Sequence, residues 1–544
     1  MKLLQQLLEQ VQVQLLNGCL PVLVLAVTLG APVAWILGDY CRILWIRRKM
    51  PPGPFPLPLV GNFYDIPKSK PWIEWEKWSD VYQSTMITLW NGRRPIIVCN
   101  DIWSISDLLE KRAAIYSSRP HFVVMGDMMN MSKTNQVCQV YGDAWRLHRR
   151  LTHTIVGSQA VRNYRTDQSN ESKVLMRDLL QHPEGFEQAI ERYSCSVVSI
   201  LGWGRRIDRM NDVVAQVAMG FMEGVNYVIP GLYIMEAVPW LAKLPAWIYP
   251  LPSAIYNGTN HMHRYFAALC KEAATSEKQD NFSKRLVAAQ DEHGLSDEDI
   301  SSLTANMIGG GVDTTTSTTL TLILAMCVFP EVQKKAQEEL DAVVGYGRYP
   351  DWSDEDSLPY IRAVVNEALR WRTVTILGGI PHAPIRDDEY KGYLIPKDTA
   401  ITGNMWAIHR NPRDFPEPDV FRPERFLGGL EMPYPNKRGH NAFGWGRRQC
   451  SGQPLAEQGL FITVARLLWA YNIQPGLDEK GQPVELDIFA YTESENTRPE
   501  PFKARFTPRS KETEQIILGD AEEAREALRY LDGDTKITMA SVAR

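Results

Sequence analysis

The distribution of apolar residues predicts one long hydrophobic helix near the start of the chain, followed by a mainly helical globular region. Residues 10–38 contain no charged side chain, and residues 18–38 are long and apolar enough to span a bilayer, which takes about 20 residues. Four basic residues follow between positions 42 and 49, and only Lys2 precedes the apolar run. The positive-inside rule therefore predicts a lumenal tail of residues 1–17 and a cytosolic body. A cleaved signal peptide is the alternative, although its N-terminal flank would be weakly basic.

Prolines follow the basic positions and separate the predicted anchor from the body. Residues 39–60 include PPGPFPLP at positions 51–58, whose five prolines exclude a helix or a central strand and stiffen the chain into a hinge. No Gly/Ser linker, low-complexity block or repeat interrupts residues 61–508, which predicts one large domain. A charged extension covers residues 509–544, and DAEEAREALRYL within it has the pattern of an amphipathic helix with no indicated function.

A second long apolar helix is predicted near the middle of the chain. Acidic residues from Asp297 onward favour a helix start, and the run 320–328 is apolar on all sides, as in a helix buried inside a large protein. The glycines at 309–311 are poor helix formers. They indicate either close packing against another helix or a flat ligand lying against this face. Beside such a ligand, the acid and hydroxyl of Asp313 and Thr314 would relay protons into a dry pocket.

An acid–base pair lies on the next apolar helix. Glu367 and Arg370 are three residues apart in YIRAVVNEALRWR and therefore share one helix face. A surface ion pair is the default interpretation and would contribute little stability. The apolar residues around the pair also allow burial, in which case further polar partners are required.

Composition narrows the classes of function. The chain has 544 residues and a formal net charge of −5, so it lacks the basic balance that is typical of nucleic-acid-binding proteins. Its eight cysteines are scattered along the chain, which is typical of a reducing compartment rather than a disulfide scaffold.

One of these cysteines has unusual neighbours. Cys450 lies in FGWGRRQCSG, residues 443–452, among three glycines and two arginines. A zinc site would require CxxC or a Cys/His cluster, and a disulfide would require a second cysteine. The stretch offers neither, so this cysteine needs another explanation.

Taken together, the motifs resemble those of the cytochrome P-450 family, the haem-thiolate monooxygenases. The family signature Phe-x-x-Gly-x-Arg-x-Cys-x-Gly is matched at Phe443, Gly446, Arg448, Cys450 and Gly452. Five further matches occur in the family's order: PPGP, WRLHRR with Trp145 and Arg149, GGVDTT from 310 to 315, Glu367 with Arg370, and FRPERF with Arg425. The resemblance extends from about residue 18 to residue 508 and points to fungal microsomal members of secondary metabolism.

The resemblance implies a mainly α fold with small β-sheets, the cytochrome P-450 fold, with haem b between the long central helix and the cysteine-containing loop. Cys450 would ligate the iron as a thiolate, an electron donor that favours O–O cleavage. Backbone N–H groups of the turn would hydrogen-bond the sulfur, and Gly446 and Gly452 would let the backbone approach haem and sulfur. Phe443 would pack against this loop and keep water out.

Other matched residues take their expected roles from the family. Propionate contacts are expected from Trp145, Arg149, His382 and Arg448. An ordinary basic helix face for the first two, and a simple loop histidine for His382, are the alternatives. A buried structural network that holds the haem loop is expected from Glu367, Arg370 and Arg425.

The implied activity is that of an NADPH-dependent monooxygenase in the endoplasmic reticulum membrane, acting on O2 and a hydrophobic small molecule. Asp313 and Thr314 would deliver protons for O–O cleavage. The chain shows no GxGxxG on a strand–helix unit, so its electrons would come from NADPH–cytochrome P-450 reductase. A basic surface with Lys437, Arg438 and Arg447 would receive this partner, or would be an ordinary solvated face.

Two other functions stay open from the residues. A haem-thiolate isomerase or dehydratase would need no reductase and would usually lack the Asp–Thr pair, whereas a non-catalytic haem protein would need no proton delivery. Substrate contacts are expected from methionine-rich residues 120–140, from Asn306 and Gly310, from 374–379 and from 490–492. The apolar stretch 229–252 would dip into the membrane or form an ordinary helix–loop pair.

Overall fold

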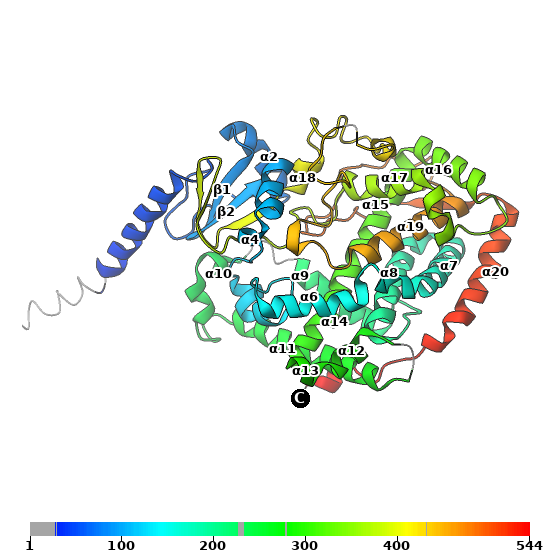
Figure 1. The fold of residues 1–544 in the computed structure, drawn as a ribbon, viewed down its shortest axis with the longest axis horizontal. Coiled ribbons are helices and arrows are strands. Elements are labelled where there is room, and N and C mark those ends of the chain that lie inside the picture. Colours follow the sequence, from blue (N-terminus) through cyan, green and yellow to red (C-terminus); the bar gives the residue numbers. More distant parts are fainter. Residues whose placement is uncertain (1–27, 29, 227–232, 278–279, 431, 544) are drawn as a thin grey trace, which may run out of the picture.

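Helices build most of the molecule, and the small sheets occupy part of its periphery (Figure 1). The computed structural model describes residues 28, 30–226, 233–277, 280–430 and 432–543. The largest helices around the centre are α6 (Asp143–Val156), α7 (Arg165–Gln181), α8 (Phe186–Trp203), α11 (Leu251–Thr275), α16 (Pro330–Val343), α17 (Pro359–Trp371) and α19 (Gln453–Ala470). Smaller helices are α2 (Pro71–Tyr82), α3 (Ile102–Ser106), α4 (Ala113–Tyr116), α5 (Met131–Thr134), α9 (Val213–Asn226), α10 (Ile234–Ala237), α12 (Phe282–Ala288), α13 (Gln290–His293) and α18 (Met405–His409). This mainly α architecture with small sheets confirms the predicted fold class.

The strands form three small sheets. Antiparallel β1 (Met86–Asn91) and β2 (Arg94–Cys99) form a hairpin, and β5 (Ala400–Gly403) adds to β2 in parallel. Two separate hairpins pair β3 (Asp388–Tyr390) with β4 (Tyr393–Ile395), and β6 (Tyr471–Pro475) with β7 (Ala504–Pro508). The first hairpin turns at Gly92, whose φ of +60° lies in the left-handed region that glycine tolerates.

The long central helix is interrupted once, where the sequence predicts it to be continuous. α14 (Asp297–Gly311) ends and α15 (Asp313–Val328) begins on either side of Val312. The Thr314 hydroxyl donates to the carbonyl oxygen of Gly310 at 2.5 Å, a side-chain bond that competes with the helical backbone pattern. Among the described residues, Asp297–Val328 is the one stretch long and apolar enough to cross a membrane, but 78 % of its apolar window is buried, so it is a core helix.

The predicted anchor, residues 18–38, lies largely outside the described residues. From residue 30 to residue 47 the chain is helical, and Figure 1 shows this helix projecting from the body. Trp35 is 56 % exposed on it. Its base is tied to the β1–β2 turn because Arg93 donates to the Asp39 carboxylate at 2.6 and 2.7 Å.

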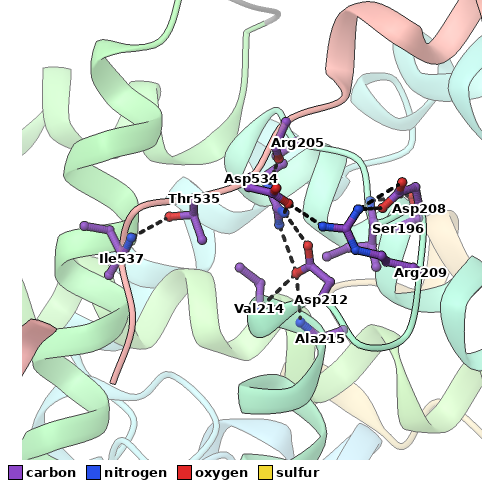
Figure 2. A network of polar contacts seen from close by, with 12 residues as sticks. Ser196, Arg205, Asp208, Arg209, Asp212, Val214, Ala215, Asp534, Thr535 and Ile537 are labelled. Carbon is purple, nitrogen blue, oxygen red and sulfur yellow. Dashed lines mark hydrogen bonds and ion pairs between the residues drawn. The ribbon is translucent and has the colours of Figure 1, made fainter. Parts of the chain in front are cut away.

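The charged C-terminal extension packs on the domain. α20 (Lys511–Leu528) lies against α7 along the edge of the molecule and buries Ile517, Ala524 and Leu528 (Figure 1). The following segment crosses the turn between α8 and α9, where Asp534 faces Arg205 and Arg209 (Figure 2). The extension is therefore an amphipathic helix followed by a polar strap.

Candidate active site

A cavity of about 340 Å³ lies between the central helix and the loop that precedes α19. Gly310 and Thr314 line it from the helix, and Phe443, Cys450 and Gly452 line it from the loop. A Cβ added to Gly310 would meet no atom within 4 Å, whereas one on Gly311 would lie 2.3 Å from Cγ1 of Val198 on α8. Each predicted reason for the glycine run therefore holds for one residue: Gly311 allows helix packing and Gly310 leaves room in the cavity.

The loop presents the sulfur of Cys450 at the start of a long helix. The Cys450 N–H donates to the carbonyl oxygen of Phe443 at 2.9 Å, which closes the loop, and the Cys450 side chain is exposed toward the cavity. Removal from bulk water raises the pKa of the thiol, while the N–H groups of Gly452 and Gln453 and the nearby Arg149 guanidinium act in the opposite direction. The positive end of α19 thus partly offsets burial, and the pKa of the thiol stays above its ordinary value in the protein without haem.

Three glycines allow close packing at or next to this loop. Gly446 does not line the cavity; its φ is +55°, and an added Cβ would lie 2.2 Å from the carbonyl oxygen of Leu109. The Trp445 ring is buried against two backbone segments, since a Cβ on Gly378 or Gly403 would come within 2.6 or 2.4 Å of it. The structure thus shows Gly446 close to the π-helix Asp107–Lys111, and the approach of its backbone to haem stays a prediction.

Three arginines reach the cavity without an acidic partner. Among the described residues, no carboxylate pairs with Arg119, Arg149 or Arg448. Arg448 donates to the carbonyl oxygens of Ser117, Gln136 and Gln139, Arg119 to those of Val137, Ile380 and Pro381, and Arg149 to the Ser451 hydroxyl at 2.6 Å. Burial, followed by repulsion from Arg119, lowers the pKa of Arg448 to about 8, and burial lowers that of Arg119 to about 10.

His382 and Trp145 line the cavity beside these arginines. His382 Nδ1 donates to the carbonyl oxygen of Tyr116 at 2.9 Å, and the side chain is buried at the cavity wall. Burial and then the charge of Arg119 hold the pKa of His382 well below its ordinary value. The Arg448 guanidinium lies 4.5 Å from the centre of the Trp145 ring. All four predicted propionate contacts, Trp145, Arg149, His382 and Arg448, are therefore brought together.

These residues fit a haem. Cations removed from water are normally paired, so one buried and two half-buried arginines without a carboxylate among the described residues are a site for an anionic ligand. The two propionates of haem supply that charge. Cys450 offers the sulfur ligand, and Gly310 leaves space on the opposite wall. The donor set thus matches a haem held by its propionates and by a thiolate.

The predicted structural network is also assembled. Glu367 and Arg370 are fully buried and form two hydrogen bonds of 2.7 Å, and Arg425 Nε lies 3.5 Å from Glu367 Oε1. Arg370 donates further to the carbonyl oxygens of His409 and Pro418 at 2.7 and 3.0 Å. The buried alternative for this pair is therefore the one found, with the additional partners that burial requires.

The predicted proton-delivery pair is divided between the cavity and the core. Thr314 lines the cavity, with its hydroxyl bonded to Gly310. Asp313 is 6 % exposed and does not line the cavity. The helix interruption turns the hydroxyl toward the cavity, while the carboxylate lies behind it.

Comparison with known proteins agrees with this geometry. The family model for cytochrome P-450 matches residues 51–496. The chain belongs to the cytochrome P-450 family. A cytochrome P-450 monooxygenase of Armillaria gallica is 34 % identical over 523 residues, which cover 92 % of this chain and 96 % of the relative. The tryptamine 4-monooxygenase of Psilocybe cyanescens is 33 % identical over 490 residues, 87 % of this chain and 96 % of the relative. The protein is thus a cytochrome P-450 monooxygenase, and its family implies haem with a cysteine thiolate ligand.

The substrate part of the cytochrome P-450 cavity differs from the sequence prediction in two segments. Asn306, Gly310 and four residues between 374 and 379 line it as predicted, and the Nδ2 of Asn306 is buried without a partner in the described part of the chain. Of residues 120–140, only Gln136 and Val137 line this cavity, since Met125, Met128 and Met131 are buried in separate apolar clusters. Residues 490–492 do not line it either.

Sequence reasoning missed Arg119. The surrounding sequence, YSSRPHFVV, shows only that Arg119 is a basic residue at the point where a polar run gives way to an apolar one. It reaches the cavity because it lies beside the bridge that pairs Ser118 with Ala383, close to His382. That pairing joins segments more than 260 residues apart, so local spacing could not reveal it.

Proposed function

We propose that this cytochrome P-450 monooxygenase inserts one oxygen atom of O2 into a hydrophobic small molecule, using electrons that NADPH–cytochrome P-450 reductase supplies at the endoplasmic reticulum membrane. One observation carries the haem-dependent part of this proposal. Buried Arg119 and half-buried Arg149 and Arg448, which have no acidic partner among the described residues, line the same cavity as the Cys450 sulfur.

Haem, when bound, supplies the iron chemistry that activates O2. Cys450 would be its axial ligand, oriented by the loop that the Phe443 carbonyl closes. Arg119, Arg149 and Arg448 would hold the propionates, and His382 would join them as a donor once a carboxylate restores its proton. The network of Glu367, Arg370 and Arg425 would keep the polypeptide beneath the loop in place.

Thr314 would hold a proton at the cavity wall. Its hydroxyl donates to Gly310, so its oxygen is free to accept a hydrogen bond from a water or from an acid behind it. Asp313, on the other side of the helix interruption, would supply protons to this hydroxyl from the core side. The arrangement keeps the carboxylate out of the apolar cavity.

The reductase would dock near the loop that carries Cys450. Arg146 and Arg447 flank one ring, with guanidinium carbons 5.5 and 5.2 Å from the centre of Tyr141. Lys437 and Arg438 are exposed on the segment before the loop. A basic surface of this kind would attract an acidic electron donor and orient its approach.

The membrane surface would include both the N-terminal helix and the region of α10. The carbonyl oxygen of Ala237 in α10 lies against Gly92, next to Arg93, which holds the base of the helix. Beyond α10, Trp240 and Trp247 are 62 % and 85 % exposed. Exposed tryptophans are typical of membrane interfaces, which supports a body that rests on the cytosolic face.

The experiment is turnover of the full chain in membranes with reductase, NADPH and oxygen-18-labelled O2, screened against apolar small molecules. The proposal predicts products that carry one labelled oxygen and that require both NADPH and reductase. Product formation without reductase, or without incorporation of label, would contradict it.

Thr314→Ala tests the proton role within the same assay. We expect haem content to be unchanged and the fraction of NADPH electrons recovered in product to fall by at least about tenfold, with hydrogen peroxide formed instead. Thr319→Ala is the matched control, because Thr319 makes the same bond to the fourth preceding carbonyl but does not line the cavity. Equal coupling in the Thr314 variant and the parent would exclude proton delivery by this hydroxyl.

A further inference from the structure

A second cavity of about 90 Å³ adjoins the active site and contains an acid that the proposed chemistry does not use. It shares Gly379 and Ile380 with the larger cavity, and Glu495 lines it. Glu495 is held firmly, because its carbonyl oxygen accepts from the N–H of Ile376 at 3.1 Å. Two residues later the N–H of Thr497 donates to Val374 at 2.8 Å. The acid is thus fixed beside the strand-like segment that forms the active-site wall.

The Glu495 carboxyl lacks a counter-charge. Its Oε1 is buried and has no hydrogen-bond partner in the described part of the chain. Only the backbone N–H groups of Leu377 and Gly379 face the carboxyl, and no cation offsets its burial, which raises its pKa to about 8. Buried carboxyl oxygens normally have partners, so this one indicates a missing group.

Of the other charged groups of this cavity, Asp398 is exposed to solvent, and Glu236 and Arg94 have partners of their own. Glu236 accepts from the N–H groups of Val123 and Val124 at 3.0 and 2.7 Å. Arg94 donates to the carbonyl oxygen of His121 at 2.7 Å and lies in the field of Glu236. Glu495 therefore differs from its neighbours in having an oxygen without a partner.

We propose that Glu495 is a specificity-determining residue that binds the amine of an apolar substrate, an inference that rests on the proposed monooxygenase function. An ammonium group supplies both the positive charge and the N–H donor that the carboxyl lacks. The walls of the small cavity include Trp75, Ile96, Phe122 and Met125, which favour hydrocarbon around the amine. Among the described residues, no side-chain carboxylate lines the larger cavity, so the amine would have its acid in the smaller one.

The two cavities share part of their wall, and at Gly379 that wall has no side chain. Gly379 contributes no side chain there, and the nearest atom to an added Cβ would be Cγ2 of Thr375 at 3.8 Å. With its amine at Glu495, a substrate extends past Gly379 and Ile380 into the cavity of Cys450. The pairing would therefore select amines and would turn their hydrocarbon end toward the site of oxidation.

The test compares primary phenylalkylamines of increasing chain length with the corresponding phenylalkanols. Dissociation constants are measured by equilibrium dialysis on the reduced holoenzyme under carbon monoxide, because an amine can otherwise ligate haem iron directly. We expect at least one amine to bind the parent about tenfold more tightly than its alcohol. Glu495→Gln, which keeps the shape and removes the charge, should abolish that preference and leave alcohol binding within about twofold.

Glu493→Gln is the matched control. Glu493 is exposed two positions away and accepts from the Ser69 hydroxyl at 2.5 Å, so its variant should bind amines as the parent does. An amine preference that is equal in the parent and in Glu495→Gln, or absent from the parent, would overturn the inference. If Glu495→Gln fails to take up haem, Glu495→Asp, which retains the acid, is measured in its place. Loss of the preference for amines at every chain length in Glu495→Asp would then overturn the inference.

The carbon monoxide spectrum of the parent distinguishes a failure of the proposed monooxygenase function from a failure of the inference about Glu495. A parent without the band of thiolate-ligated haem would fail the proposed function itself. A parent with that band and with no dependence of amine binding on Glu495 would fail only the further inference.

Discussion

Two clusters of charged side chains in this molecule, one buried and one half-buried at the active-site cavity, have opposite compositions. At the junction of α7 and α8, Glu171 is fully buried and is paired with Arg192 at 2.7 Å and with Arg206 at 2.6 Å. Around the active-site cavity, Arg149 and Arg448 have no acidic partner among the described residues. The first cluster is complete within the polypeptide, whereas the second needs an anion from outside it.

The pKa values of the two clusters show the same contrast. Burial alone would raise the pKa of Glu171, but the charges of Arg192 and Arg206 outweigh it and lower that pKa. At the cavity nothing outweighs burial, and the pKa of Arg448 falls to about 8. A buried arginine with a carboxylate is therefore a structural element here, and one without a carboxylate marks the binding site of an anion.

Breaking the complete cluster should have the largest effect on stability. Arg206→Met leaves Glu171 with one of its two cations, and removing one partner of a buried pair costs about 3–5 kcal/mol. We expect that loss in urea-induced unfolding, with and without haem. Arg209→Met, on the same turn but half exposed at its ion pair with Asp534, should cost less than about 1 kcal/mol. A small effect at Arg206 would contradict the structural role of this cluster.

The corresponding change at the cavity should affect the ligand instead. Arg149 bonds only to the Ser451 hydroxyl among the described side chains, so Arg149→Met should change the unfolding free energy of the haem-free protein by no more than about 1 kcal/mol. Haem should dissociate at least about tenfold faster, since a propionate loses its cation. Transfer of haem to an excess of apomyoglobin measures this rate. Unchanged haem release together with a destabilised apoprotein would remove the distinction between the two clusters.

Glu171 in the paired cluster and Glu495 beside the active site should contribute to stability with opposite dependences on pH. The lowered pKa of Glu171 means that its contribution to stability is full above its ordinary pKa of 4.5 and is lost as the pH falls through the lower folded value. The pKa of Glu495 is raised to about 8, so its contribution is full below 4.5 and is lost as the pH rises through 8. Between pH 4.5 and pH 8, the unfolding free energy of Glu495→Gln should fall less steeply with rising pH than that of the parent. The difference should be about 1–2 kcal/mol in unfolding series recorded without amine. Parallel series would contradict the raised pKa.

The smallest effect is expected in the exposed strap. Asp534 is 74 % exposed and lies 2.8 and 3.7 Å from Arg209 and Arg205 (Figure 2). Because water and salt screen such pairs, Asp534→Asn should lower the unfolding free energy by less than about 1 kcal/mol, and high salt should remove the difference. A loss as large as that of Arg206→Met would show that the strap belongs to the buried cluster.

The sequence predicted those parts of the site that carry motifs of the cytochrome P-450 family. Cys450 and Arg448 lie in one such motif, Trp145 and Arg149 lie in another, and His382 is at a position where the family often places a basic residue, so the resemblance predicted that they meet although they are far apart in the chain. Arg119 was missed because a tertiary pairing brings it to the cavity. The contact of Gly446 with Leu109 was not predicted for the same reason, since Leu109 is over 330 residues away in sequence.

The sequence predicted the mainly α fold class, but it did not predict the break in the central helix or the place where the C-terminal extension packs. The apolar run after residue 320 correctly indicated a buried helix, but the break at Val312, next to the Thr314 side-chain bond to Gly310, was not predicted. The charge of the C-terminal extension suggested no role, whereas Ile517 and Leu528 place one face of it in the core. The pattern of apolar residues predicted a helix in the extension, but the position of α20 depends on its packing against α7.

The most direct test of the central claim is the carbon monoxide difference spectrum of the reduced protein, recorded for the parent, Cys450→Ser and Cys41→Ser. Cys41 is the matched control because it is exposed and free and lies far from the cavity in the N-terminal helix. The account predicts the long-wavelength Soret band of thiolate-ligated haem in the parent and in Cys41→Ser, and its complete loss in Cys450→Ser. A band that survives in Cys450→Ser, or a parent with the shorter-wavelength band of histidine ligation, would contradict it.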